Sequence, residues 1–330
     1  KLTLQKKQRK NNQERKEDKK MAISASMVKE LREMTGAGMM DCKKALTETD
    51  GDMDKAVDYL RENGLAKAEK KAGRIAAEGI VKTNISADKK RASIVEVNSE
   101  TDFVAKNEKF QAFVEAVAAQ AIDTDAADIE AFLNEAWAAD TSKTVNEELA
   151  SMIATIGENM NIRRFEKVSC DNGIVVDYIH AGGKIGVLVA AETDSTSDAV
   201  VECLKNVAMQ VAAMNPKYLS SADVSDEYKE KEKEVLLAQA KNDPKNAGKP
   251  DEIIEKMIIG RLNKELKEVC LTEQLYVKAE NKESVAKYVD MVAKENGCNI
   301  TLKQFVRFET GEGLEKKNED FAAEVASQLK

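Results

Sequence analysis

The hydrophobic pattern changes its period several times along the chain, and each change predicts a new kind of element. Residues 24–63 carry apolar side chains at helical spacing, with breaks at Thr35-Gly36-Ala37-Gly38 and at Gly51-Asp52. From Ile80 the spacing becomes that of strands, over residues 80–85 and 94–97. We therefore expect a small three-helix bundle followed by a body of mixed strands and helices, the α+β class.

The stretch Ser99 to Asn107 lies where a strand pattern stops and a helix pattern starts. Thr101 is suited to cap the helix, and Asp102 suits the positive end of the helix dipole. One interpretation makes Phe103 the first core residue of this capped helix, and the local pattern favours it. The other interpretation presents Asp102 and Phe103 to a partner from the helix tip.

The strand-to-helix pattern then recurs. Strand patterns are expected over 162–168, 174–179 and 185–190, with helical stretches over 123–140 and 145–156. The triplet Glu192-Thr193-Asp194 ends a strand before a helix, as Glu100-Thr101-Asp102 does. A weaker echo is Glu309-Thr310, ahead of an expected helix over 321–329. The repeated unit predicts duplicated α+β core subdomains, although Thr is also a common helix cap.

Residues 223–269 have a different character. Pro244 and Pro250 bracket a short turn, and a charged helical pattern with apolar positions lies on each side. These features predict a protruding antiparallel helical hairpin, a coiled coil roughly 30 Å long. Such a projection is more typical of interaction or dimerisation than of catalysis.

These patterns divide the chain into successive segments. The expected segments are a disordered basic extension (1–20), a ubiquitin-associated-like helical domain (21–64), a linker (65–79), an N-terminal α+β core subdomain (80–160), the first part of a C-terminal α+β core subdomain (161–222), the coiled-coil hairpin (223–269), the completion of the C-terminal core subdomain (270–308) and a C-terminal helical module (309–330).

Charge and cysteine usage narrow the function classes. The chain has a net charge of −8, which argues against general nucleic-acid binding. Residues 1–20 are strongly basic and carry almost no large apolar side chains, so we interpret them as an extension ahead of Met21-Ala22, with a basic arm for RNA or membrane as the alternative. Five widely spaced cysteines are typical of reduced thiols in the cytoplasm, and no apolar run is long enough to span a membrane.

No pattern for a reaction centre is found. The sequence lacks a phosphate-binding P-loop, and Gly182-Gly183-Lys184-Ile185-Gly186 joins two predicted strands as a hairpin turn. His180 is the single histidine, which rules out a site with two histidine ligands. We therefore expect no metal, no cofactor and no enzymatic activity, and a protein that acts by binding.

The adjacent residues Met39 and Met40 are a candidate contact. Neighbouring positions on a helix point about 100° apart, so both cannot lie at the centre of one core. We expect one methionine in the core and the other exposed as an adaptable contact.

Several motifs together carry a resemblance to translation elongation factor Ts. Residues 27–46, with Thr35-Gly36-Ala37-Gly38-Met39-Met40, resemble the N-terminal signature of that family, and Glu100-Thr101-Asp102-Phe103-Val104-Ala105 resembles its second signature. Further similar segments are 156–164, 180–189, 255–257 with Gly260-Arg261, and 307–309 with 311–313. The likeness covers residues 22–330 in order.

The resemblance implies a guanine nucleotide exchange factor for the GTPase elongation factor Tu, one that binds no nucleotide itself. It implies that the Asp-Phe pair intrudes near the Mg²⁺ and phosphate site of the GTPase, displaces Mg²⁺ and promotes GDP release. The residues implied as partner contacts are Thr101, Asp102, Phe103, Val104, Met39, Met40, Lys43, Ile156, Gly157, His180 and Val277.

Two alternatives stay open at this point. A ubiquitin-associated-like adaptor or scaffold with coiled-coil dimerisation would explain the methionine pair and the hairpin, but not the Asp102-Phe103 stretch. An enzyme would need a bound metal or cofactor. The sequence leaves open whether the hairpin packs within the chain, forms a homodimer or contacts another ligand.

Overall fold

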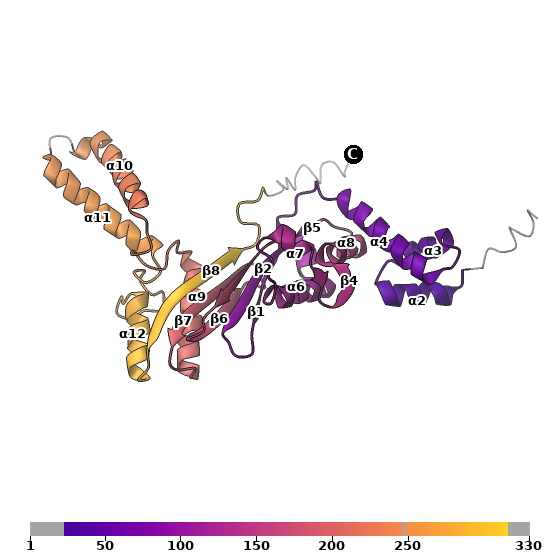
Figure 1. The fold of residues 1–330 in the computed structure, drawn as a ribbon. Helices are drawn as coiled ribbons and strands as arrows, with labels where there is room; N and C mark the ends of the chain where they lie inside the picture. Colours follow the sequence, from indigo (N-terminus) through magenta and orange to yellow (C-terminus); the bar gives the residue numbers. More distant parts are fainter. Residues whose placement is uncertain (1–22, 247–248, 316–330) are drawn as a thin grey trace, which may run out of the picture.

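The computed structural model describes residues 23–246 and 249–315, and it has the expected α+β class (Figure 1). The elements, in chain order, are α2 (Ala25–Thr35), α3 (Met39–Glu48), α4 (Met53–Glu69), β1 (Glu78–Ile85), β2 (Arg91–Ser99), α5 (Asp102–Ala105), α6 (Glu108–Ala121), α7 (Ile129–Leu133), β3 (Ala136–Trp137), β4 (Asp140–Thr144), α8 (Val145–Ile156), β5 (Met160–Ser169), β6 (Gly173–His180), β7 (Ile185–Thr193), α9 (Asp198–Met214), α10 (Asp226–Asn242), a 3₁₀ turn (Pro244–Asn246), α11 (Asp251–Val269), α12 (Val285–Glu295) and β8 (Ile300–Glu309).

Helices α2, α3 and α4 share a small core of their own. Leu31, Cys42, Leu46 and Ala56 are fully buried in it. We expect the helical unit to end at Asn63-Gly64 and a linker to follow, and in the structure α4 continues through the first part of that linker to Glu69. The continuation packs along α8, and this burial offsets the cost of about 1 kcal/mol for a glycine inside a helix. Only the residues between α4 and β1 are left to act as a linker.

The body of the molecule has four layers. Sheet β1-β2-β5 is antiparallel and packs one face against α6, where Val95 and Val97 of β2 are buried. Its other face, which carries Ile94, packs against the second antiparallel sheet, β6-β7-β8, through Leu188 and Phe308. Helices α9 and α12 cover the outer face of that second sheet. Because alternate residues of a strand point to opposite faces, β2 is apolar on both sides.

Two expectations for this body are corrected. We expect the strand over 162–168 to belong to the second subdomain, but the corresponding β5 pairs with β2 and completes the first sheet. The helix expected over 123–140 is only the single short α7, followed by the hairpin β3-β4. Asp128 caps α7, and Trp137 turns inward to pack on Phe113 with ring centroids 5.8 Å apart. This burial of a large aromatic side chain outweighs the helical propensity of the alanine-rich stretch.

Helices α10 and α11 extend away from the sheets (Figure 1). They pack on each other through a row of buried apolar side chains, which includes Leu236, Ile254 and Leu262. A bridge between Tyr218 and Cys270 joins the two chain segments at their base. The helix expected over 321–329 lies outside the described residues, and the segment after β8 forms turns as far as Leu314.

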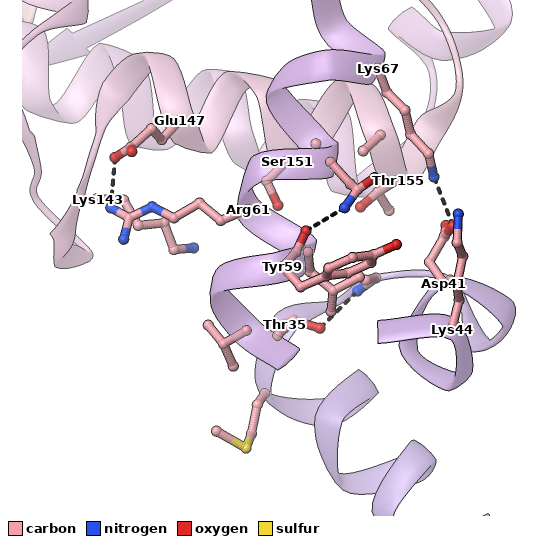
Figure 2. Close-up of a pocket in the computed structure, with 18 of the residues that line it drawn as sticks. Thr35, Asp41, Lys44, Tyr59, Arg61, Lys67, Lys143, Glu147, Ser151 and Thr155 are labelled. Atoms are coloured by element: carbon pink, nitrogen blue, oxygen red, sulfur yellow. Dashed lines mark hydrogen bonds and ion pairs between the residues drawn. The ribbon is translucent and has the colours of Figure 1, made fainter. Parts of the chain in front are cut away.

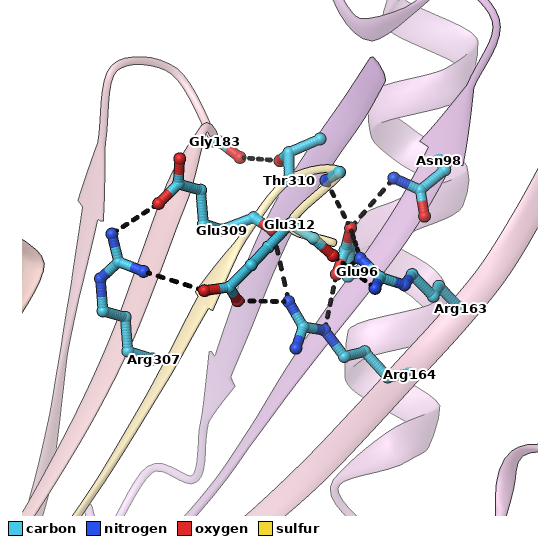
Figure 3. A network of polar contacts seen from close by, with 10 residues as sticks. Glu96, Asn98, Arg163, Arg164, Gly183, Arg307, Glu309, Thr310 and Glu312 are labelled. Atoms are coloured by element: carbon cyan, nitrogen blue, oxygen red, sulfur yellow. Dashed lines mark hydrogen bonds and ion pairs between the residues drawn. The ribbon is translucent and has the colours of Figure 1, made fainter. Parts of the chain in front are cut away.

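A buried carboxylate ties the end of β8 to the first sheet (Figure 3). Glu96 of β2 has no exposed surface, and it accepts hydrogen bonds from Arg163, Arg164 and the Gly311 N–H at 2.6–3.0 Å. A β-bulge in the β2-β5 pairing at Glu96 directs both adjacent arginines toward this one carboxylate. Burial raises the pKa of Glu96, but the Gly311 N–H, Asn98 and Arg164 together bring it below its ordinary value. Glu96 is therefore ionised at neutral pH.

Candidate partner-binding surface

The single-turn helix α5 presents Phe103 to solvent. Thr101 caps this helix, as predicted, because its hydroxyl oxygen accepts a hydrogen bond from the Val104 N–H at 3.4 Å. Phe103 exposes 79% of its surface, an unusual state for a large aromatic side chain. The local pattern had favoured a core position for Phe103, and that interpretation is wrong. An exposed apolar side chain on a capped helix tip suits contact with a partner.

The reason for this exposure is a break in the helix. The spacing of phenylalanines suggested one helix from Phe103 through Phe110, but α5 stops at Ala105 and α6 starts at Glu108. Asn107 starts the new helix by accepting hydrogen bonds from the N–H groups of Lys109 and Phe110. The break changes the direction of the chain, so that Val104 and Ala105 fill the core in place of Phe103. Val104 is buried, so its side chain supports the tip from below.

The charges at the tip are paired. Lys106 Nζ lies 2.7 Å from Asp102 Oδ2, and it also stands 6.0 Å from the centroid of the Phe103 ring. The hydrogen bond from Lys106, helped by the charge of Lys184, holds the pKa of Asp102 below its ordinary value. Asp102 is therefore a carboxylate at neutral pH, and a partner cation or N–H group could compete with Lys106 for it.

Two reciprocal hydrogen-bonded links hold the tip to the end of α8. Glu158 accepts hydrogen bonds from the Thr101 N–H at 3.0 Å and from the Thr101 hydroxyl at 2.7 Å. Glu100 accepts a hydrogen bond in return from the Asn159 N–H at 2.6 Å. Gly157 ends α8 with φ of 94°, a conformation that glycine adopts without strain. We call these hydrogen bonds of Glu100 and Glu158 the clamp. The predicted contacts Ile156, half-buried beside the first core, and Gly157, exposed, both lie next to it.

The turn between β6 and β7 carries His180 on its exposed side. The Tyr178 hydroxyl lies 2.9 Å from His180 Nδ1. Gly183 closes the turn against β1, where a Cβ atom on Gly183 would lie 2.8 Å from Ile80. Lys184 forms an ion pair with Glu78 of β1. Because Glu78 is paired with Ser99 at the end of β2, just ahead of α5, this turn and the α5 tip belong to the same end of the sheets.

Comparison with known proteins identifies the family. A family model described as Elongation factor TS matches residues 100–312, more than half of the chain. A protein named Elongation factor Ts from Clostridium botulinum (strain Alaska E43 / Type E3) is 57% identical over 307 residues, which cover 93% of this chain and 99% of that protein. Another protein of that name, from Trichlorobacter lovleyi, is 54% identical over 311 residues, 93% of this chain and 98% of its own length.

The chain belongs to the elongation factor Ts family. Membership of this family places it among the elongation factors of protein biosynthesis. The region matched by the family model begins at Glu100 and so includes the α5 tip, the end of α8 and the β6-β7 turn.

Met39 and Met40, the adjacent methionines of α3, are both on the surface. They expose 59% and 76% of their surfaces, so the expectation that one of them lies in the core is wrong. Cys42, Ala45 and Leu46 of the same helix fill the small core instead. Lys43, the third candidate on α3, is also exposed.

Val277 lies apart from the other candidates, beside α9 on the outer face of the second sheet. Its side chain is exposed, and its N–H donates to Gln210 Oε1 at 2.9 Å. Leu275, which we did not single out as a contact, is exposed nearby on the same segment. The clamp formed by Glu100 and Glu158 was also missed, because no local pattern marks residues far apart in sequence that share hydrogen bonds.

The described part of the chain shows no other obvious chemistry. Among residues 23–246 and 249–315, no group of three His, Cys, Asp or Glu side chains is placed to hold a metal ion. No helix in these ranges combines the length and apolar character needed to cross a membrane.

Proposed function

We propose that this chain is a guanine nucleotide exchange factor that binds elongation factor Tu, displaces Mg²⁺ and promotes GDP release. The observation that carries the proposal is the exposure of Phe103 on a capped, clamped helix tip in a member of the elongation factor Ts family. A rigid tip suits a wedge, because a flexible one would yield before it moved the elements of the partner.

The physical basis is linkage between two ligands of the GTPase. GDP with Mg²⁺ and the exchange factor each favour a different state of the GTPase, so each weakens the binding of the other. Phe103 enters between elements that hold Mg²⁺, and Asp102 offers a carboxylate at the same place. When the cation is lost, the phosphates of GDP lose the charge that held them, and GDP leaves. Rebinding of GTP expels the factor by the same reciprocity.

The remaining candidates divide into two contact surfaces and one outlying contact. Thr101, Ile156 and Gly157 lie beside the tip, and His180 lies at the same end of the sheets. Met39, Met40 and Lys43 form a second surface on α3. Val277 contacts the partner separately from these. Because Val104 is buried, its role is to anchor the tip rather than to contact the partner.

The other units have supporting roles. Helices α2–α4 act as a ubiquitin-associated-like unit that binds the GTPase, and α10 with α11 forms a projecting coiled coil available for a homodimer. The chain acts in the cytoplasm and itself binds no nucleotide.

Release of a fluorescent GDP analogue from elongation factor Tu tests the proposal directly. Adding this chain in substoichiometric amounts should accelerate release, because an exchange factor turns over. Unchanged release would refute the proposal. A micromolar dissociation constant of GDP for the isolated chain would contradict the absence of a nucleotide site.

A further inference from the structure

Two surfaces proposed to contact the partner belong to different units of the molecule. Met39 and Met40 are on α3 in the N-terminal helical unit, and Phe103 is on α5 above the first sheet. Helix α8 packs into the core of the first sheet through Val145, Leu149 and Ile153, and α4 of the helical unit lies along it. The 12 residues of α8 make it about 18 Å long.

The N-terminal end of α8 is tied to α4 by Arg61 (Figure 2). Arg61 donates to Glu147 Oε2 at 2.7 Å and to the Ser142 carbonyl oxygen. Glu147 also accepts from the Thr144 N–H at 2.7 Å, so it caps α8 while it holds Arg61. The bond to Arg61 keeps the pKa of Glu147 below its ordinary value, so the pair is charged at neutral pH.

Beyond Arg61, helix α4 runs alongside α8. A Cβ atom on Gly64 would lie 3.9 Å from the Ala150 carbonyl oxygen, which is ordinary contact distance between the two helices. Further along, Lys71 Nζ donates to the Ile153 carbonyl oxygen at 3.4 Å. Arg61 lines a cleft of about 290 Å³. On the side of this cleft opposite Arg61 in Figure 2, the ion pair of Lys67 with Asp41 joins α4 to α3.

The C-terminal end of α8 is tied to the tip. Gly157 closes the helix, and Glu158 directly after it binds the N–H and hydroxyl of Thr101, the residue that caps α5. A continuous series of polar contacts therefore runs from Asp41 on α3, through α4 and α8, to the residue before Asp102 and Phe103.

We propose that α8 is a spacer that fixes the distance between the α3 surface and the α5 tip, and that Arg61 is its positioning residue. This inference rests on the proposed function, because it concerns two surfaces that bind one GTPase. When two binding surfaces are held at the right spacing, contact of the first gives the second a high effective concentration. Loss of Arg61 removes the polar contact that holds the middle of α4 at the start of α8, so α3 moves relative to the tip and the partner meets the two surfaces at varying distances.

The spacing can be measured without the partner. Spin labels at Thr47→Cys on α3 and Lys109→Cys on α6 occupy exposed positions, in a Cys298→Ser background because the other four cysteines are buried. Pulsed electron spin resonance should give a narrow distance distribution for this protein and a clearly broader one after Arg61→Ala. Arg91→Ala is the matched control, since it removes another arginine–carboxylate pair, with Asp123, away from α4 and α8. Equal widths for Arg61→Ala and the control would overturn the spacer.

GDP release then tests the consequence for function. With Arg61→Ala, the concentration of factor giving half-maximal release should rise about tenfold, while the maximal rate stays unchanged because the tip is intact. Arg61→Lys should recover part of the loss, and Arg91→Ala should behave as the unmodified chain. If the unmodified chain releases GDP and Arg61→Ala has the same half-maximal concentration, the spacer role is refuted alone. If the unmodified chain does not release GDP, the proposed function fails and the spacer role with it.

Discussion

Phe103 and Phe110 are chemically identical side chains that the structure places in opposite environments, seven residues apart. Phe103 exposes 79% of its surface, whereas Phe110 exposes none. Burying a whole phenylalanine side chain is worth about 3 kcal/mol, so the buried fifth of Phe103 contributes about 0.6 kcal/mol. We therefore expect Phe103→Ala to change the free energy of unfolding by less than about 1 kcal/mol. The buried Phe110→Ala should cost about 3–5 kcal/mol, because it also leaves a cavity.

The order of the two substitutions should be reversed for nucleotide exchange, measured per folded molecule: Phe103→Ala should have the larger effect and Phe110→Ala the smaller. An aromatic anchor at the centre of an interface typically contributes 2 kcal/mol or more, so Phe103→Ala should lower kcat/KM for GDP release by about 30-fold or more. Phe110→Ala should keep most of its activity per folded molecule, since its side chain does not reach the surface.

Urea unfolding followed by circular dichroism gives the stabilities, and release of a fluorescent GDP analogue gives the rates. If Phe103→Ala were as unstable as Phe110→Ala, Phe103 would be a core residue and the exposed tip would be wrong. If Phe103→Ala were stable and fully active, Phe103 would be exposed as described, but its role as a wedge in GDP release would be refuted.

Three further predictions concern stability and reactivity. Glu96→Gln should cost about 2 kcal/mol at pH 7, because the half-buried Arg163 and Arg164 lose a charged hydrogen-bond acceptor. Since the folded pKa of Glu96 is depressed, its contribution to stability is lost as pH falls below about 4, and the difference in stability between Glu96→Gln and the unmodified protein should narrow there in acid titrations. Gly64→Ala should raise the free energy of unfolding in urea by up to about 1 kcal/mol, since the new Cβ meets no close atom, and a decrease would contradict the packing of α4 on α8. In the native protein a thiol reagent should modify Cys298 first, because the other four cysteines are buried. Burial also raises the pKa of Cys203 and of Cys270 to about 11, so few of their thiols are ionised at neutral pH. Rapid reaction of more than one thiol would contradict this burial.

Local signals in the sequence predicted part of the candidate site. Thr101 was expected to cap the helix at the tip, and it does so, because a cap involves only residues within three positions. The exposure of Phe103 was not evident from the pattern, since its spacing to Phe110 fits one continuous helix. Asn107, a good capping residue at the break, was the signal that could have separated the two helices.

Surface and core on α3 were also only partly predictable. Helical spacing shows that Met39 and Met40 point in different directions, and we expected one of them to be buried. Both are exposed, because the core of the small helical unit is already filled by Cys42, Ala45 and Leu46. Whether one more side chain of α3 is buried depends on the volume that the side chains of the neighbouring helices already fill.

The sequence by itself determined the α+β class, most of the strands, the Thr101 cap and the family to which the chain belongs. These depend on spacing and on contacts within a few residues. The tertiary structure alone decided that β5 completes the first sheet, that α4 continues along α8, and that Glu158 holds Thr101 from 57 positions away. Such contacts depend on how elements that are distant in sequence pack in one core and share hydrogen bonds. Tertiary contacts of this kind leave no periodic pattern along the chain.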